Sequence, residues 1–244
     1  IKVGIPQECP VKACGRYYPE RVDDVAWEND LTAFRAYGPA LQETGERAFG
    51  YDIWTKYNTT EPVVEARYEG ELNPDMKAKI AELGKTDPKA AQELYRSVSY
   101  HVDHGNWLDC YKVGPTLGGG TTALMAGDTI VYPYCYATQE ILDNGPLRFT
   151  VKLVYNPLVV KGDSTIIETR IITLDAGSYC NKTVVSYTNL KETMPLAVGI
   201  VLHEPDGAIV ADAANGYMTY VDPTDNAGAV SYTHLRAHET RHDL

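Results

Sequence analysis

The densest group of side chains that could do chemistry lies at residues 100–112, in the run YHVDHGNWLDCYK. It holds His101 and His104, and histidine is the side chain that exchanges a proton near neutral pH. On a strand, His101 and Asp103 would face one side while the residues between them face the other. Gly105 could break such a strand and let the two imidazole rings converge.

Three uses of this run stay open. The HxDH motif has ligand types that suit a divalent metal, although its spacing is irregular. A loop with hydrogen-bonded surface histidines is the second use. The third is acid–base catalysis, in which the two histidines exchange protons with a substrate. We predict no cofactor, with a divalent metal as the alternative.

Aromatic side chains form a second candidate surface. Tyr132, Tyr134 and Tyr136 alternate with smaller residues, so on a strand their rings would share one face. Trp27 and Trp107 add large flat rings. The chain has 18 tyrosines but only 3 phenylalanines, so most of its aromatic surface carries a hydroxyl group. That composition suits stacking on sugars together with hydrogen bonding, and a cross-strand ladder that stabilises a sheet is an equal alternative.

Charged residues crowd the stretch 21–35, which holds two arginines and several acidic side chains. We interpret most of them as structural ion pairs and expect Arg35 to point into a groove. His203 and Glu204, at the end of a predicted strand, are a weaker candidate site. Three glycines at 118–120 predict a structural turn, because the lysine of a phosphate-binding loop is missing.

The formal net charge of −11 limits the classes of binding partner that we expect. Nucleic acid is excluded as an expected partner, because affinity for it depends on Lys and Arg at phosphates. An anionic membrane surface is disfavoured for the same reason, and no apolar run is long enough to cross a bilayer. An acidic substrate requires a locally basic site. The five cysteines show no CxxC spacing, so Cys9 and Cys14 are read either as a bridge or as free thiols.

The pattern of the chain predicts an all-β domain with a small helical insertion. Residues 73–97 are the clearest helical region, with Asn73 and Asp87 as caps, each followed by proline, and with Gly84 ending the first helix. Residues 25–37 predict a strand pair with a turn at Asn29 and Asp30. Further short strands, separated by turns, continue to residue 221, as in an antiparallel β-sandwich. We therefore expect one catalytic domain over residues 1–228.

The C-terminal tail differs from the rest of the chain. Residues 230–240 agree without a break with the translation of a common transposon-type sequencing adapter. We therefore expect residues 229–244 to be non-native and the native domain to be truncated at its C-terminus. Residue 1 is isoleucine and no leader precedes it, so the chain looks like a mature or cut fragment. The three tail histidines are excluded from any site on this ground.

Three stretches carry a resemblance to a known family: DDVAWENDLTAFRAYGPAL, YHVDHGNWLDCYKVGPTLGGG and ITLDAGSYCNKTVVSY. They resemble a bacterial family, long a domain of unknown function, found among enzymes that degrade plant and algal polysaccharides. The family is similar to an ulvan-oligosaccharide dehydratase, which removes water from a terminal uronic acid and leaves an unsaturated sugar. The resemblance implies a β-sandwich of the galactose-mutarotase supersandwich kind and a periplasmic or secreted location.

Dehydration across C4 and C5 of a uronate needs a group that neutralises the carboxylate, a base for the C5 proton and an acid for the C4 hydroxyl. For these roles we expect the catalytic residues His101, His104, Lys112, Tyr111 and Tyr134. We expect the substrate-binding residues Arg35, Trp27, Trp107, Asp109 and Tyr132. Arg35 is an alternative to Lys112 at the carboxylate, and the two tyrosines are alternative proton carriers.

Two other functions remain as alternatives to the dehydratase. A sugar epimerase or mutarotase would pair His101 or His203 with Glu204 or Asp103. A non-catalytic carbohydrate-binding module would use the tyrosines and tryptophans and would not need the histidines. In all three cases the expected partner is a sugar, and for the dehydratase it is an acidic oligosaccharide.

Overall fold

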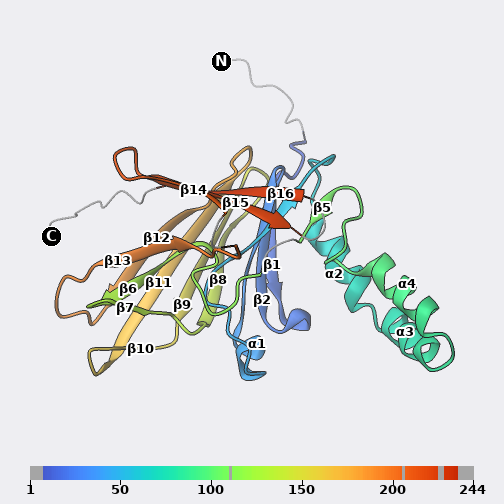
Figure 1. The fold of residues 1–244 in the computed structure, drawn as a ribbon, viewed down its shortest axis with the longest axis horizontal. Helices are drawn as coiled ribbons and strands as arrows, with labels where there is room; N and C mark the ends of the chain where they lie inside the picture. Colours follow the sequence, from blue (N-terminus) through green and yellow to red (C-terminus); the bar gives the residue numbers. More distant parts are fainter. Residues whose placement is uncertain (1–7, 110–111, 205–206, 225–227, 236–244) are drawn as a thin grey trace, which may run out of the picture.

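The computed structural model describes residues 8–109, 112–204, 207–224 and 228–235, and strands dominate them. In chain order the elements are β1 (Ala13–Tyr18), η1 (Pro19–Arg21), β2 (Asp24–Asn29), β3 (Thr32–Ala36), α1 (Pro39–Glu43), β4 (Asp52–Lys56), α2 (Val64–Leu72), α3 (Pro74–Thr86), α4 (Pro88–Val98), β5 (Trp107–Leu108), β6 (Gly119–Ala126), β7 (Thr129–Val131), β8 (Tyr136–Asn144), β9 (Arg148–Tyr155), β10 (Leu158–Val160), β11 (Asp163–Asp175), β12 (Lys182–Thr188), β13 (Leu196–Ile200), β14 (Ala208–Asp212), β15 (Tyr217–Thr224) and β16 (Gly228–Leu235). The predicted all-β class with a small helical insertion is confirmed, because the longer helices all lie between β4 and β5 (Figure 1).

Two antiparallel sheets form the sandwich. The first has the strand order β1-β2-β3-β4-β5, and the second has the order β10-β11-β9-β8. Strand β12 also pairs with β11, beyond the stretch that pairs with β10. Strands β1 and β2 contact β8, β9 and β11, so the two sheets pack face to face (Figure 1).

The main core lies between these two sheets. Alternate residues of β2 and β3 face it, with Val25 opposite Ala36 and Trp27 opposite Phe34. The Trp27 ring stacks on Phe34 at a centroid distance of 5.9 Å and on Phe149 of β9 at 6.2 Å. Each such buried side chain contributes about 1.5–3 kcal/mol through removal from water. The faces of β2 and β3 that point to the second sheet therefore contribute to the stability of the sandwich.

Two smaller antiparallel sheets complete the β structure, with the orders β13-β6-β7 and β14-β15-β16. Strand β6 contributes Leu124 to a second apolar cluster with Leu158, Val160 and Ile166. The chain approaches itself closely where β6 begins. A Cβ atom on Gly118, whose φ is +57°, would lie 2.7 Å from the backbone oxygen of Tyr51. The glycines at 118–120 thus serve close backbone packing and the start of β6, and they do not form only a turn.

The helices α2, α3 and α4 project from the side of the sandwich (Figure 1). The predicted caps are confirmed, because the side chains of Asn73 and Asp87 accept hydrogen bonds at 3.0 Å from the amides of Met76 and Ala90. Gly84 does not end the first helix, contrary to the prediction. Helix α3 continues past it, and its backbone is not left-handed there, so the glycine has no capping role.

Two local predictions about strands are wrong. Residues 101–106 form turns and bends, so His101 and His104 do not lie on a strand. Residues 132–135 have no regular structure between β7 and β8, so Tyr132 and Tyr134 share no strand face with Tyr136. In both places the chain leaves a sheet to reach another element, which residue spacing alone does not reveal.

Strand β16 reaches into the segment that we expect to be non-native. It pairs with β15 from Tyr217 opposite Leu235 to Thr224 opposite Gly228. The adapter interpretation therefore stays a prediction, which resequencing of the source gene tests. The four cysteines in the described residues, among them Cys9 and Cys14, are free thiols. Within the same residues, every helix is too short or too polar to span a bilayer.

Candidate functional site

The outer face of the first sheet carries charged side chains that are buried. These residues alternate with the core residues of β2, β3 and β4, and they lie under the helical insertion. Asp24, Arg35 and Asp52 have exposed fractions of 0, 3 and 0 %. Burying a charge costs free energy unless the charge is paired, so a cluster of this kind calls for an explanation.

Arg35 is the centre of this group, which we call the Arg35 cluster (Asp24, Arg35, Tyr37, Asp52 and Tyr100). Its Nε and Nη2 both donate to Oδ2 of Asp52, the first at 3.1 Å. Its Nη1 lies 3.5 Å from Oδ2 of Asp24 and donates to the Tyr100 hydroxyl at 3.1 Å. The Tyr37 hydroxyl accepts from Arg35 and donates to Asp52, both at 3.1 Å. The guanidinium is therefore fully engaged inside the protein.

Two carboxyl groups of the cluster have shifted acidities. Burial raises the pKa of Asp52 to about 7, against the opposing effect of Arg35, and the nearby Asp109 raises it further. Burial likewise raises the pKa of Asp24 to about 6, again opposed by Arg35. Two buried carboxyl groups share one guanidinium, so the cluster takes up a proton near neutral pH.

Asp109 connects this cluster to the surface. Its side chain is 4 % exposed, and its Oδ2 lies 2.7 Å from Nδ1 of His101, whose side chain is 49 % exposed. The two atoms are in contact, but Oδ2 receives no in-line hydrogen bond from the part of the chain that the structure describes. Catalytic hydrogen bonds are often poorly aligned without substrate. When Nδ1 carries the proton that faces Asp109, Nε2 carries the lone pair and can accept a proton.

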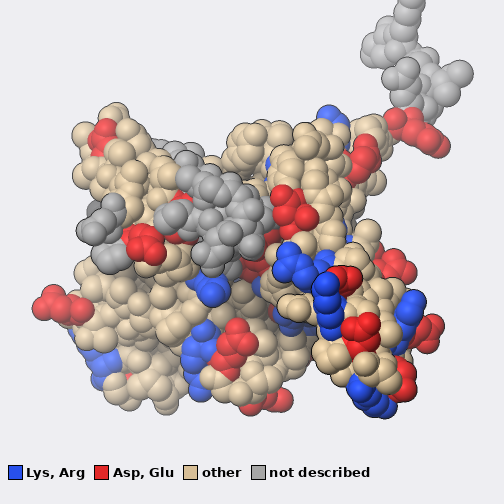
Figure 2. Space-filling view, turned by 45° about the vertical axis from the view of Figure 1, so that its right-hand side comes forward, with Lys and Arg blue, Asp and Glu red and all other residues tan. Residues whose placement is uncertain are grey.

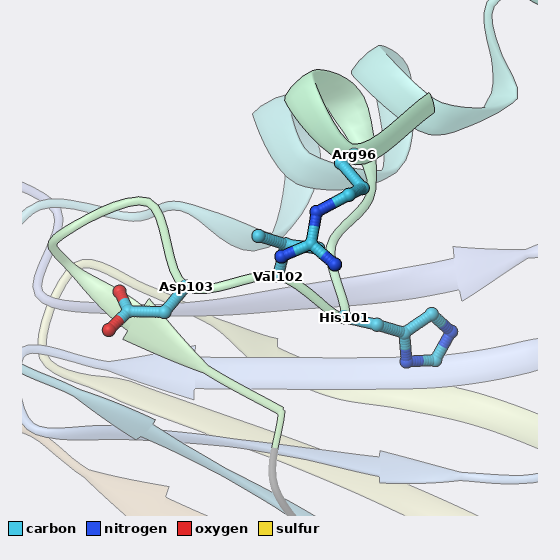
Figure 3. Close-up of a pocket in the computed structure, with 4 residues that line it drawn as sticks. All are labelled: Arg96, His101, Val102 and Asp103. Carbon is cyan, nitrogen blue, oxygen red and sulfur yellow. The ribbon is translucent and has the colours of Figure 1, made fainter. Parts of the chain in front are cut away.

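A pocket of about 310 Å³ lies beside His101 and is lined by Arg96, His101, Val102 and Asp103. In Figure 3 the Arg96 side chain descends from α4 between Asp103 and His101, whose side chains point in opposite directions. Arg96 makes no ion pair within the described residues, so its guanidinium can receive an anion. The pocket thus joins one exposed proton carrier and one exposed cation.

The other polar residues of the run 100–112 have different positions. Nε2 of His104 lies 2.9 Å from the backbone oxygen of Ser99, so this ring holds the loop together. The Asp103 carboxylate accepts from the Tyr57 hydroxyl, and this bond lowers the pKa of Asp103. Lys112 is exposed. The structure therefore does not bring His101, Asp103 and His104 around one point, and no described group of three His, Cys, Asp or Glu side chains could hold a metal.

The remaining predicted site residues are scattered. Trp27 and Trp107 are 0 % exposed, so their rings offer no face to a sugar. Tyr132 stacks on Phe49, with centroids 5.1 Å apart. Tyr134 is 39 % exposed, and its hydroxyl donates to a backbone oxygen of α1 at 3.1 Å. Tyr111 lies outside the described residues. Of the predicted catalytic and substrate-binding residues, His101 lines the pocket and contacts Asp109. The prediction that Arg35 points into a groove is wrong, because its side chain is buried and its guanidinium is engaged by Asp52 and tyrosine hydroxyl groups.

Two residues of the site were missed from the sequence. Asp52 lies in DIWTK, whose alternation of polar and apolar residues predicts a strand and would have placed Asp52 and Trp54 on one face. Arg96 lies in the last turn of α4, where a basic residue is expected for the helix dipole alone. Only the path of the chain after α4 brings Arg96 next to His101.

The fold and the site define a β-sandwich domain in which a buried charged cluster reaches the surface through an aspartate–histidine pair. The chain belongs to the family described as a domain of unknown function (DUF4861), whose model matches residues 5–236. It is 28 % identical over 224 residues to the uncharacterized protein P7 of Formosa agariphila, and the match covers 89 % of this chain and 50 % of that protein. The chain thus spans about half the length of the curated relative that it matches. No solved structure matches the chain.

Proposed function

We propose that this domain is a carbon–oxygen lyase that removes water from a uronic acid at the non-reducing end of an acidic oligosaccharide, such as one from ulvan. The observation that carries the proposal is the contact between His101 and Asp109 at the edge of a pocket that also holds Arg96. Removal of water next to a carboxylate needs a proton carrier and a cation, and the pocket offers one of each.

In the proposed reaction, Nε2 of His101 accepts the proton on C5 of the sugar. The electron pair of that C–H bond forms the C4–C5 double bond, and the bond from C4 to its hydroxyl oxygen breaks. The proton held on His101 passes to the departing oxygen, so water leaves and the imidazole returns to its neutral form. Atoms and charge balance without a second reactant, because one histidine serves first as base and then as acid.

Arg96 supplies the local positive charge that an acidic protein needs for an acidic substrate. Figure 2 shows Lys and Arg close together with Asp and Glu over the projecting helices. A guanidinium binds a carboxylate through two parallel hydrogen bonds, and it stabilises the charge that spreads onto the carboxylate when C5 loses its proton. Arg96 replaces Arg35 and Lys112 as the expected carboxylate partner in this proposal.

The test is ultraviolet absorbance over time with oligosaccharides that end in a saturated uronic acid. A rise is expected from the conjugated double bond. The rise should fall at least about 100-fold in His101→Ala, as for loss of a general acid–base group. Arg96→Lys keeps the charge but loses the paired hydrogen bonds, so we expect a higher KM and a lower kcat. Asp175→Asn, in the exposed pair with Arg148, is the control and should keep the activity.

Two results would redirect the proposal. Absence of any rise, with exchange of the C5 hydrogen for deuterium from solvent, would indicate an epimerase that uses the same His101. Absence of both, with binding seen by calorimetry, would indicate a carbohydrate-binding module. Equal activity of His101→Ala and the unchanged protein would remove His101 from the reaction.

A further inference from the structure

A second histidine–aspartate pair lies where β13 leaves the sheet. Nδ1 of His203 contacts Oδ2 of Asp222 in β15, and Nε2 of the same ring lies 2.7 Å from the backbone oxygen of Lys112. His203 thus joins three parts of the chain that are far apart in the sequence. Both ring nitrogens face protein atoms, so this imidazole is not placed to act on a substrate.

The partners of His203 and Asp222 fix the proton on one ring nitrogen, Nε2. Its side chain is 1 % exposed, and its Oδ1 accepts from the Tyr220 hydroxyl at 3.0 Å. That hydroxyl in turn accepts from the amide of Glu204 at 3.0 Å, so its own proton points to Asp222. The Lys112 carbonyl is only an acceptor, so Nε2 of His203 donates to it. Nδ1 of His203 then either donates to an ionised Asp222 or accepts from Oδ2 of a protonated Asp222.

The same segment is held by apolar packing. Val113 is 2 % exposed and packs in one cluster with Tyr220 and Ala48. The backbone at Lys112 and Val113 is therefore attached to β15 by a polar and an apolar contact. This attachment begins three residues after Asp109, the partner of His101.

We propose that His203 is a positioning residue, which fixes the chain at Lys112 and so holds the Asp109 carboxylate behind His101. Its effect on turnover rests on the proposed function, whereas its structural effect does not. Without the bond from Nε2, the backbone at Lys112 and Val113 would keep only its apolar attachment to β15.

The first measurement is nitrogen-15 NMR of the imidazole groups in the unaltered protein. We expect Nε2 of His203 to carry a proton in the folded state. A folded protein in which Nε2 carries no proton would overturn the proposal, because the ring could not then donate to Lys112.

The second measurement compares His203→Ala with Asp222→Asn by hydrogen exchange. In Asp222→Asn the amide can donate to Nδ1 and still accept from Tyr220, so a neutral His203 keeps its bond to Lys112. In His203→Ala we expect amides at residues 116–121 to exchange about tenfold faster, as for loss of a hydrogen bond that holds the chain, with strand β9 unchanged. Asp222→Asn should exchange like the unaltered protein.

The third readout is the Nδ1 proton of His101 next to Asp109, observed in the same variants without substrate. It should shift in His203→Ala and stay in place in Asp222→Asn. An unchanged His101 signal in His203→Ala would show that His203 supports only the fold near β15. Since none of these readouts needs turnover, they remain decisive if the protein proves not to be a dehydratase.

Discussion

Two arginines are buried among the residues that the structure describes, and their surroundings differ. Arg170 of β11 pairs with Glu168 of the same strand, and both are 0 % exposed. Arg170 also donates to Thr121 and to the backbone oxygen of Thr122, and its guanidinium lies 4.5 Å from the ring centre of Tyr155. One positive and one negative charge balance there, deep between the sheets. We call this group the Arg170 cluster.

The Arg35 cluster lacks that balance. Arg35 contacts both Asp24 and Asp52, and Asp109 adds a third carboxylate that acts on Asp52. Asp109 also reaches an exposed histidine, so the cluster is coupled to the surface. Burial of an arginine therefore does not by itself mark a functional site. A surplus of buried acid with a route to solvent is the more specific sign.

The largest expected effect is a loss of stability when a buried arginine is replaced, and its repair should depend on whether the arginine has one acidic partner or two. Arg170→Met leaves Glu168 buried and unpaired, and we expect the free energy of unfolding to fall by about 3–5 kcal/mol. The double change Arg170→Met with Glu168→Leu should recover most of this loss. Arg35→Met with Asp52→Leu should recover less, because Asp24 stays unpaired. Urea unfolding of the unaltered protein, the single variants Arg170→Met and Arg35→Met, and the two double variants checks this, and equal recovery in both clusters would contradict the comparison.

The second effect is a pH dependence of the unfolding free energy, which arises from the raised pKa of Asp52. Its pKa is about 7 in the folded protein, above the usual value, so the folded state binds the extra proton. The unfolding free energy should therefore fall as pH rises from about 4 to about 7, by about 1.4 kcal/mol at most for each pH unit. Asp52→Asn should flatten this slope. Asp175→Asn is the control, because the pKa of Asp175 is lowered by Arg148 and its window lies below pH 4.

A third test concerns the route to solvent through Asp109. Asp109→Asn removes the charge that orients the ring of His101, and we expect activity to fall about 10–100-fold, as for other partners that orient a functional histidine. Initial rates of ultraviolet absorbance change measure it, with circular dichroism to confirm folding. Asp175→Asn again serves as the matched surface control. Full activity in a folded Asp109→Asn protein would separate the Arg35 cluster from the reaction.

The smallest expected effect is the loss of stability when the hydroxyl group of one tyrosine in each cluster is removed. The Tyr37 hydroxyl bonds to Arg35 and Asp52, both at 3.1 Å, whereas the Tyr51 hydroxyl accepts from Arg170 at 3.4 Å. We expect Tyr37→Phe to cost about 1 kcal/mol of stability and Tyr51→Phe less than about 0.5 kcal/mol. Thermal unfolding of the two variants gives the order, and a larger loss for Tyr51→Phe would reverse it.

Local signals in the sequence predicted much of the fold. The turn at Asn29 and Asp30 is confirmed, because the Asn29 side chain accepts from the amides of Leu31 and Thr32, both at 2.9 Å. The helix caps at Asn73 and Asp87 are confirmed for the same reason. In each case a short polar side chain bonds to the backbone within three residues, so no distant contact is needed.

Contacts between segments that are far apart in the chain could not be predicted from the spacing of residues in the sequence. Trp27 and Trp107 were predicted to bind sugar, but removal of large rings from water favours the interior. Arg96 and His101 meet only because the chain reverses after α4. The pairing of Arg35 with Asp52 depends on the register of β3 with β4, which a single sequence does not specify. The candidate site was therefore predicted only at His101 and Asp109.

Strands β2 and β3 carry the sandwich core on one face and the Arg35 cluster on the other. In a saturation scan of this hairpin, the effects of substitutions should therefore alternate from residue to residue along each strand. Substitutions at Val25, Trp27 and Phe34 should lower the amount of folded protein in the cell. Single substitutions at Asp24 and Arg35 should also lower it, because they leave buried charges unpaired, and changes that remove both charges of a pair should restore it. One hairpin would thus carry two requirements on alternate residues, one for apolar packing and one for balanced charge.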